Sequence, residues 1–422
     1  MFRLLVCAVL LIASPAARAY SVLTHEAIID SAWEQNLKPL LAKRFPEASP
    51  EDLVQAHAYV YAGAIIQDMG YYPFGSHFFS DLTHYVRTGD FVMNMIADAK
   101  SLNEYAFALG SLAHYAADTH GHPLAVNPSV GMQFPKLRKK YGPSVTYADD
   151  PAAHLKVEFG FDVWQVGRGN YASSSYHDFI GFQVSKSVLE SAFRDTYSLN
   201  LPDLFTSLDL ALGTFRYSVS TVIPEMTKVA WNLRKDELRK AHPGLTRRQF
   251  RYNLSRSSYK KEFQEPHRGP GIFVRILAFF FRLIPKVGPF RSAAFEPPTS
   301  QTITLFEDSF NQTLEQYRAY LTAVDEGRLA LPNRDLDTGL ATSPAEYSLA
   351  DTTFSKLAIE LAGKEPKDVD PKVAQAVLNF FQDLNVPFAT KSDADEWDKT
   401  VKAVARLGEQ SSSPSAPPAA KP

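Results

Sequence analysis

Apolar residues along the chain gather into stretches that open with helix-starting residues. No stretch of useful length alternates apolar and polar positions as a half-buried strand does, and no internal repeat is present. We expect helices near residues 24–44, 180–198, 202–240, 302–328, 344–363 and 370–384. The pattern therefore predicts an all-α protein built as a multi-helix bundle.

Three helix starts are marked by capping residues. Residues 49–52 read Ser-Pro-Glu-Asp, which is an N-cap, a proline at the first helical position and two acids in the first turn. Ser101 and Glu104 have the spacing of a capping box and precede an apolar run. Asp150 and Pro151 open a further helix. The last two of these helices carry histidine and acidic residues that are candidate metal ligands.

Residues 1–19 have the pattern of a secretory signal peptide. Arg3 supplies the positive charge, an apolar stretch follows, and residues 17–19 (Ala-Arg-Ala) form a small-x-small cleavage site. Cys7, the only cysteine, lies in this leader, so the mature chain would begin at Tyr20 without any cysteine. We therefore expect an exported protein, periplasmic or secreted, in which nitrogen and oxygen atoms hold any metal.

Histidine is concentrated in the first part of the chain, where eight of the 11 histidines lie between His25 and His154. His114 precedes Asp118 by four residues, and His154 precedes Glu158 by four. On a helix, each pair projects from one face about one turn apart. Buried imidazole and carboxylate groups need a partner. Two such pairs on apolar helices therefore predict chelation of a divalent metal ion.

The residues around these pairs resemble bacterial zinc-dependent phospholipases C. Residues 108–118 (ALGSLAHYAAD) resemble the helix that reads YLGxxxHYxxD in that family, and residues 154–159 (HLKVEF) resemble its HxKxEx segment. Residues 77–81 (HFFSD) are similar to its His-Phe-aromatic segment, whose preceding aspartate would be Asp68. The interval from that aspartate is shorter than usual in the family, so His84 is an alternative to the first residue of this segment.

Three further residues extend the resemblance. His122 is similar to the histidine that follows the first helix in the family, although it comes two residues early and His120 competes with it. The family begins its mature chain with a tryptophan whose amine and carbonyl bind zinc, backed by a nearby histidine. Tyr20 and His25 would take these places, with tyrosine replacing tryptophan.

The resemblance implies three zinc sites in a buried trinuclear centre, which would bind two to three Zn²⁺ ions per chain. The ligands would be Asp68, His77, His114 and Asp118 at the first site; His122, His154 and Glu158 at the second; and Tyr20, His25 and a shared oxygen of Asp118 at the third. Asp68 would also act as the catalytic base. Nearby polar residues would have supporting roles: His57 in the core, and Asp81, Asp90 and Asp162 as hydrogen-bond partners or caps.

Clustered zinc ions can bind the non-bridging oxygens of a phosphodiester, lower the pKa of a bound water toward ~7 and stabilise the departing alkoxide. The resemblance thus implies a zinc-dependent phosphoric diester hydrolase of the phospholipase C type, which acts on phospholipid headgroups through a metal-activated water. Two alternatives stay open: a single-strand nuclease or nucleotidase with the same cluster, and a non-catalytic exported zinc-binding protein. The headgroup, the native metal and the oligomeric state are not determined by the sequence.

The chain of 422 residues divides into five segments. We expect a signal peptide at 1–19, a zinc-dependent catalytic helical domain at 20–242, a basic and aromatic segment at 243–300, C-terminal helices packing on the catalytic domain at 301–385, and a last helix with a disordered Ser/Pro/Ala-rich tail at 386–422. Within the catalytic domain, prolines and glycines predict a connection at 123–149.

The basic and aromatic segment is a candidate membrane contact. Between Arg247 and Arg291 the chain has 11 Lys and Arg residues and two acids, whereas the net charge of the whole chain is −2. The apolar stretch 272–284 is too short to cross a bilayer but suits a segment lying in the interface. We therefore expect peripheral membrane contact through residues 272–291, with a buried helix as the alternative and no stable nucleic-acid partner.

Overall fold

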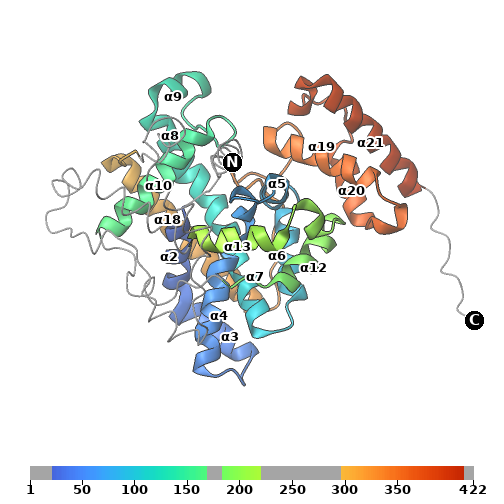
Figure 1. The fold of residues 1–422 in the computed structure, drawn as a ribbon. Coiled ribbons are helices and arrows are strands. Elements are labelled where there is room, and N and C mark those ends of the chain that lie inside the picture. Colours follow the sequence, from blue (N-terminus) through green and yellow to red (C-terminus); the bar gives the residue numbers. More distant parts are fainter. Residues whose placement is uncertain (1–20, 169–182, 220–295, 413–422) are drawn as a thin grey trace, which may run out of the picture.

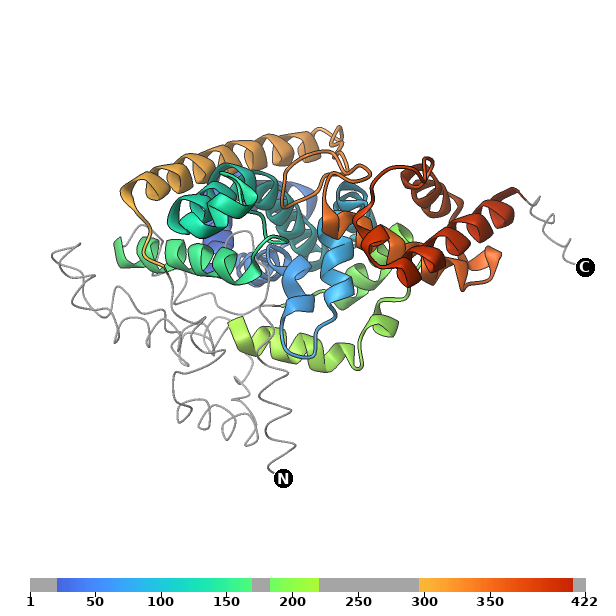
Figure 2. The ribbon, with the colours of Figure 1, turned by 90° about the horizontal axis from the view of Figure 1, so that it is seen from above.

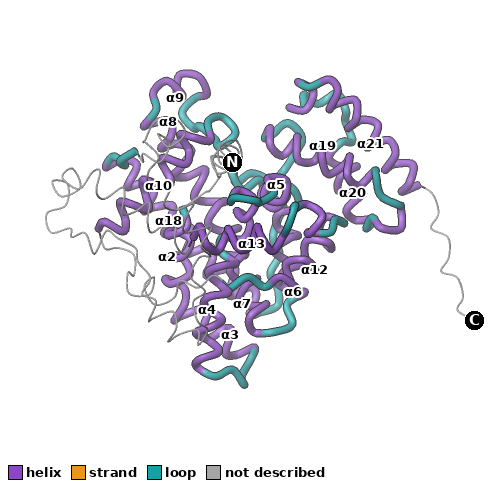
Figure 3. The backbone as a smooth tube through the Cα atoms, viewed as in Figure 1, coloured by secondary structure: helices purple, strands orange, loops and turns teal. Residues whose placement is uncertain are grey.

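The computed structural model describes residues 21–168, 183–219 and 296–412. Within these ranges every regular element is a helix, and the single β-bridge joins Arg334 and Ala341 (Figure 3). The prediction of an all-α protein is confirmed. The signal peptide, Tyr20, most of the basic and aromatic segment and the last ten residues lie outside the described residues.

One buried helix, α7 (Leu102–Gly121), forms the centre of the main body. Its capping box at Ser101 and Glu104 is present as predicted. Helices α4 (Pro50–Gly63) and α18 (Ser300–Asp325) pack along it (Figure 1). Gly63 and Gly110 allow α4 and α7 to touch, since a Cβ on Gly110 would lie 2.1 Å from the carbonyl oxygen of Val60. This close contact places the backbone after α4 against the middle of α7.

The N-terminal helices cover another face of α7. Helix α2 (Val22–Ala32) is buried over most of its length and continues through a π-helical turn, η1 (Trp33–Leu37), into α3 (Lys38–Arg44). Asp162 fixes the start of α2, because its carboxylate accepts hydrogen bonds from the Leu23 amide (3.0 Å) and the Thr24 hydroxyl (2.6 Å). Asp162, expected to be a hydrogen-bond partner or a cap, thus holds α2 in place.

A run of short elements follows α4. It comprises the 3₁₀ helix η2 (Ile66–Tyr71), α5 (His77–Tyr85) and α6 (Thr88–Asp98). Ser76 caps α5 with its hydroxyl, and the chain turns between α5 and α6 at Arg87, whose φ is 51°. These short helices bring η2 and α5 against the C-terminal half of α7.

The chain after α7 stays helical where a connection was expected. The π-helical turn η3 (His122–Val126) leads into α8 (Asn127–Gln133) and α9 (Pro135–Tyr141). Helix α10 (Pro151–Arg168) follows, and the Asp150 carboxylate accepts a hydrogen bond from the Ala153 amide at its start. Prolines at the beginning of α8 and α9 are compatible with helix because the first turn needs no amide donor.

The remaining described elements surround this core. Helices α12 (Lys186–Tyr197) and α13 (Leu208–Tyr217), with the 3₁₀ turn η4 (Leu201–Leu204) between them, cover α6 and η2. Three C-terminal helices form a separate group beside α5, seen at the upper right of Figure 1 and again from above in Figure 2. They are α19 (Ser348–Ala362), α20 (Pro371–Phe380) and α21 (Ala394–Ser412).

Aromatic side chains pack inside the C-terminal group and are continuous with the core of the main body. The rings of Phe354 and Phe380 stack at 3.8 Å, and Phe388 packs on Trp397 at 5.3 Å. Helix α19 joins this group to α5 of the main body. Among the described residues, no helix combines the length and the apolar character needed to cross a bilayer.

Candidate metal centre

Three groups of histidine and carboxylate side chains lie inside the main body, each with ligand atoms within 4.8 Å of one another. The groups are His25, His114 and Asp118; Asp68, His84 and His114; and His122, His154 and Asp337. All of these side chains are buried, and His114 belongs to two of the groups. The structure therefore brings together residues that are far apart in the sequence, from His25 to Asp337.

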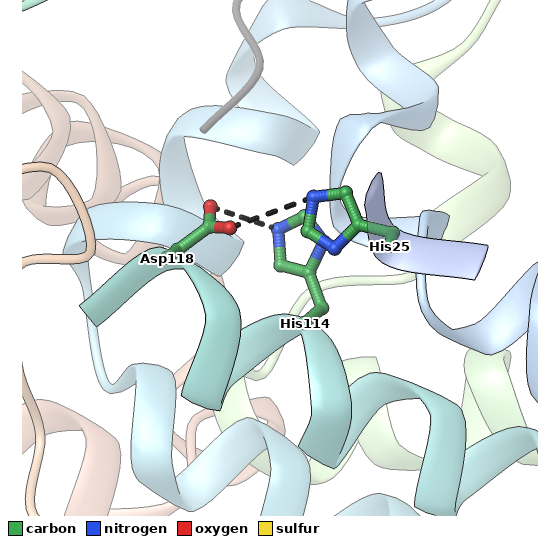
Figure 4. Close-up of side chains that lie close together, drawn as sticks. All are labelled: His25, His114 and Asp118. Carbon is green, nitrogen blue, oxygen red and sulfur yellow. Dashed lines mark ion pairs between the residues drawn. The ribbon is translucent and has the colours of Figure 1, made fainter. Parts of the chain in front are cut away.

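The first group forms on α7. His114 and Asp118 are one helical turn apart, and Nε2 of His114 lies 3.1 Å from Oδ2 of Asp118. His25 of α2 stacks on His114 with ring centroids 4.7 Å apart, and its Nε2 lies 3.7 Å from Oδ1 of Asp118. Figure 4 shows both imidazoles directed at this carboxylate. Asp118 thus offers one oxygen to each histidine.

The second group joins η2 and α5 to the same carboxylate. Nε2 of His84 lies 3.4 Å from Oδ1 of Asp68 and 3.5 Å from Oδ2 of Asp118. It is also 3.2 Å from Nε2 of His114. Since two imidazole nitrogens and two carboxylates face one another here, the four side chains enclose a position suited to a divalent cation.

Backbone carbonyls orient the histidines of this group. Nδ1 of His114 lies 3.0 Å from the carbonyl oxygen of Ala64, and Nδ1 of His84 lies 2.7 Å from that of Ser80. In each case Nδ1–H donates to the carbonyl, which leaves Nε2 to face the carboxylates. Such contacts fix the tautomer and ring orientation of metal-binding histidines.

The third group lies at η3 and α10. Nδ1 of His122 contacts Oδ1 of Asp337, and Nε2 of His154 lies 3.8 Å from the same oxygen. The two imidazole rings are 5.0 Å apart and nearly perpendicular. Glu158 lies one turn after His154, and its Oε1 is 2.7 Å from Nδ1 of His154. Asn127 contacts the other ring nitrogen at 2.7 Å.

The electrostatics of the centre favour a bound cation. Within the described residues, the carboxylate oxygens of Asp68 and Asp118 accept no hydrogen bond, although both side chains are fully buried. Burying a carboxylate without compensation costs several kcal/mol or more. Burial alone would lower the pKa of His84, yet the carboxylates of Asp118 and Asp68 raise it to about 10. The site therefore retains a positive charge, which a metal ion would supply in place of that proton.

Other histidines of the centre are already in the form that binds metal. Burial, together with the neighbouring His114, lowers the pKa of His25 to about 3, and burial lowers that of His154 to about 3 as well. Both imidazoles are neutral at pH 7 and can donate a lone pair. Burial would raise the pKa of Asp118, but His114 and His84 bring it well below its ordinary value. Neutral imidazoles beside ionised carboxylates are the donors that zinc takes when no thiolate is present.

Most of the ligands expected from the sequence meet in this centre. His25, Asp68, His114, Asp118, His122 and His154 fall in the three groups, and Glu158 contacts His154. His120 turns away, with its Nδ1 2.9 Å from the carbonyl oxygen of Ala116. Tyr20 lies outside the described residues.

His77 is the expected ligand that the structure does not bring to Asp68. It is the first residue of α5 and is exposed, whereas His84, two turns later, reaches Asp68 and His114. The two histidines are seven residues apart and share a helical face, so the spacing alone does not separate them. The C-terminal end of α5 meets the centre, and that end carries His84.

This arrangement predicts a difference between two alanine variants. His84→Ala should reduce kcat/KM about 100-fold or more, because a ligand lost from a metal site misplaces the reacting groups. His77→Ala should stay within a few-fold of wild type, because His77 is exposed and apart from the groups. Zinc content and hydrolysis of both purified variants would check this. A larger loss for His77→Ala would contradict the assignment.

Asp337 is the member of the centre that the sequence analysis missed. It follows Glu158 by more than 170 residues, and no histidine lies near it in the chain. The surrounding residues 333–339 (Asn-Arg-Asp-Leu-Asp-Thr-Gly) have the composition of a turn. The i,i+4 spacing that marks the helical pairs is therefore absent here.

Three polar residues that were expected to have supporting roles, His57, Asp90 and Asp81, lie outside the three metal groups. His57 lies outside the three groups, with Nε2 3.1 Å from Oδ1 of Asp30 and its ring stacked on Trp33. Asp90 accepts a hydrogen bond from Asn333 and pairs with Arg87. Burial raises the pKa of Asp81, although the charges of Lys356 and His77 oppose the shift.

The comparison with known protein families gives one match. Residues 24–203 match the family described as zinc dependent phospholipase C. No curated protein and no solved structure matches the chain. The matched range contains every expected ligand from His25 to Glu158 and ends far before Asp337. The family recognised from the motifs is confirmed, and zinc agrees with the nitrogen and oxygen donors of the centre.

Proposed function

We propose that this protein hydrolyses phospholipid headgroups by a zinc-dependent phospholipase C reaction, because residues 24–203 belong to the zinc-dependent phospholipase C family. The observation that carries the proposal is the set of three buried histidine and carboxylate groups, all of whose members except Asp337 lie inside this range. His114 and Asp118 link the first two groups. A centre with shared ligands holds metal ions close together, as phosphodiester hydrolysis by several metals requires.

The ligands of the three groups would bind two to three zinc ions in total. Asp68, His84, His114 and Asp118 would hold one ion, His122 and His154 with nearby carboxylates a second, and His25 with Asp118 a third. When bound, zinc would neutralise the phosphate oxygens, acidify a water molecule and stabilise the leaving alkoxide.

Asp68 is the residue we propose as the proton acceptor. Its carboxylate is fully buried, accepts no hydrogen bond within the described part of the chain, and lies 3.4 Å from Nε2 of His84. An ionised carboxylate in this position can take the proton of the attacking water while His84 limits its movement. The surrounding apolar core excludes bulk water, which strengthens these interactions.

Substrate choice is tested by comparing three phosphodiesters on the full mature protein. Phosphatidylcholine vesicles, a single-stranded oligonucleotide and bis-p-nitrophenyl phosphate would be assayed with and without a zinc chelator. We expect chelator-sensitive release of phosphocholine from the vesicles and much slower cleavage of the oligonucleotide. The reverse preference would assign the centre to a nuclease, and zinc binding without any hydrolysis would indicate a non-catalytic zinc protein.

We further propose that the protein is exported and that removal of residues 1–19 completes the third site. Among the described residues, the group around His25 contains one carboxylate, that of Asp118. Helix α2 starts at Val22, so Tyr20 is two residues before it in the sequence. A free amine at Tyr20 would have an ordinary pKa near ~7.7 and could bind zinc in its neutral form.

This proposal predicts that residues added before Tyr20 weaken the third site. Protein made with a methionine before Tyr20 should bind one of its zinc ions more weakly and should hydrolyse substrate more slowly, because the added residue moves the terminal amine. Trimming to Tyr20 with a specific protease should restore both properties. Equal zinc content and equal activity before and after trimming would exclude the terminal amine as a ligand.

A further inference from the structure

The segment that joins α18 to α19, residues 326–347, crosses the main body beside the metal centre. The amide of Leu336 donates a hydrogen bond to the carbonyl oxygen of His84 (3.0 Å), and the Tyr115 hydroxyl donates to that of Pro332 (2.7 Å). The Thr88 hydroxyl donates to the carbonyl of Arg334 at 2.7 Å. The segment is thus fastened to the helices that carry the ligands.

A tight turn in this segment directs one carboxylate inward. Oδ1 of Asp335 accepts hydrogen bonds from the amides of Asp337 (2.8 Å) and Thr338 (2.9 Å). Gly339 has φ of 72°, and a Cβ at this position would lie 2.7 Å from the carbonyl oxygen of Thr119. Because only glycine suits both conditions, the turn rests directly on the end of α7.

The Asp337 carboxylate is held from both sides. Its Oδ1 contacts Nδ1 of His122, and its Oδ2 accepts hydrogen bonds from the Tyr347 hydroxyl and the Tyr147 amide, the latter at 3.2 Å. The backbone carbonyl of Asp337 accepts a hydrogen bond from Asn127 at 2.8 Å. With 1% of the residue exposed, this carboxylate is oriented before any ligand binds.

The imidazole of His122 is buried beside this carboxylate. The other ring nitrogen of His122, Nε2, is buried, and it neither donates nor accepts a hydrogen bond within the described residues. The Asp337 carboxylate thus contacts a buried imidazole that has one unsatisfied ring nitrogen.

We propose that Asp337 is a zinc ligand of the His122/His154 group, so that a segment far outside the family match completes the metal centre. The inference rests on the proposed zinc-dependent function. Two histidines and one carboxylate give three protein ligands, which is the usual set at catalytic zinc sites with an open position for substrate or water. Residues 326–347 are then part of the active site, and the catalytic unit extends beyond residue 203.

The inference is tested by zinc content rather than by activity alone. In full-length protein, Asp337→Asn should lose about one zinc ion per chain, or release it to a chelator at least 10-fold faster than wild type. The matched control is Asp351→Asn, which removes another buried carboxylate of the C-terminal region. Asp351 accepts hydrogen bonds from the amides of Ala345 (2.9 Å) and Ala389 (2.7 Å), and it belongs to none of the metal groups. This control should keep its zinc.

A second variant reports on direct coordination. Asp337→Cys in a Cys7→Ser background, loaded with Co²⁺, should show a thiolate-to-cobalt charge-transfer band, because the introduced cysteine would be the only source of a thiolate in the chain. If Asp337 only orients His122, the band will be absent. Absence of the band in folded Asp337→Cys overturns the inference, and so does wild-type zinc content and release in Asp337→Asn. If one variant folds poorly, the other variant still decides.

The outcomes also separate this inference from the proposed function. If wild type binds zinc without cleaving phospholipid while Asp337→Asn loses a zinc ion, the ligand assignment stands and the proposed substrate falls. If wild type cleaves phospholipid and Asp337→Asn keeps all its zinc, the proposed function stands and the ligand assignment falls.

Discussion

Replacing Asp118 by Asn is expected to abolish hydrolysis and to disturb two of the three metal groups at once. Asp118 directs Oδ1 toward His25 and Oδ2 toward His114 and His84, at distances between 3.1 and 3.7 Å. An amide offers one oxygen and no negative charge, so it cannot serve both positions. We expect a loss of about 1,000-fold or more in kcat/KM, equivalent to about 4 kcal/mol of transition-state stabilisation.

The measurement pairs steady-state kinetics with zinc counting. The matched control is Asp30→Asn, which removes a carboxylate that pairs with a buried histidine, His57, outside the three groups. Both substitutions remove one charge from the N-terminal half, and both should lower stability. Only Asp118→Asn should lose zinc and activity together. If Asp30→Asn loses as much zinc as Asp118→Asn, the loss reflects general unfolding, and the shared role of Asp118 is not supported.

The helices that carry this shared residue could be predicted because their signals are local. The N-cap at Ser49 and the capping box at Ser101 lie where the sequence places them. Since helix geometry fixes the i,i+4 relation, His114 with Asp118 and His154 with Glu158 also followed from spacing alone. In these cases neighbouring residues contain the whole of the information.

Short elements and long-range contacts could be predicted less well from the sequence. Helix α5 starts at a single capping serine, Ser76, and is separated from α6 by Arg87 in a left-handed conformation, which no local pattern required. The choice between His77 and His84 depends on which end of α5 meets α7, and tertiary packing places the His84 end there. Asp337 depends on the path of the chain after α18, so only the folded structure brings it to His122.

Removing zinc is expected to abolish hydrolysis and to destabilise the whole main body. The proposed ligands come from α2, η2, α5, α7, η3 and α10 and from the segment after α18, so bound ions would link elements that are distant in the sequence. Binding at free zinc 1,000-fold above Kd contributes about 4 kcal/mol to the free energy of unfolding. For a chain of this size we expect the Tm to fall by roughly 5–10 °C on chelation.

Calorimetry with and without a chelator, followed by readdition of metal, would measure this effect. Zn²⁺ should restore both Tm and activity, whereas Mg²⁺ should restore neither, because imidazole nitrogen is a poor ligand for magnesium. An unchanged Tm after complete removal of zinc would mean that the three groups do not bind metal tightly in the folded protein.

The pH dependence of stability should differ between the metal-free and the zinc-loaded protein. In the metal-free protein the pKa of His84 is raised to about 10, so the folded state holds a proton that the unfolded state releases near ~6.5. This contribution is complete below pH ~6.5 and is lost as the pH rises toward 10. His25 and His154, whose pKa values are lowered to about 3, act in the opposite direction. Their neutral folded forms cost stability progressively as the pH falls below ~6.5.

Stability of the metal-free protein should therefore be greatest near pH 6.5 and decline on both sides. In the zinc-loaded protein the ion takes the place of the His84 proton, so the alkaline decline between pH 7 and 10 should disappear while the acidic decline becomes steeper. Denaturant unfolding at several pH values, with and without zinc, would show this. The metal-free His84→Gln variant is the matched control and should lack the alkaline decline. An equal alkaline decline in wild type with zinc, wild type without zinc and this variant would show that His84 does not exchange a proton for the metal.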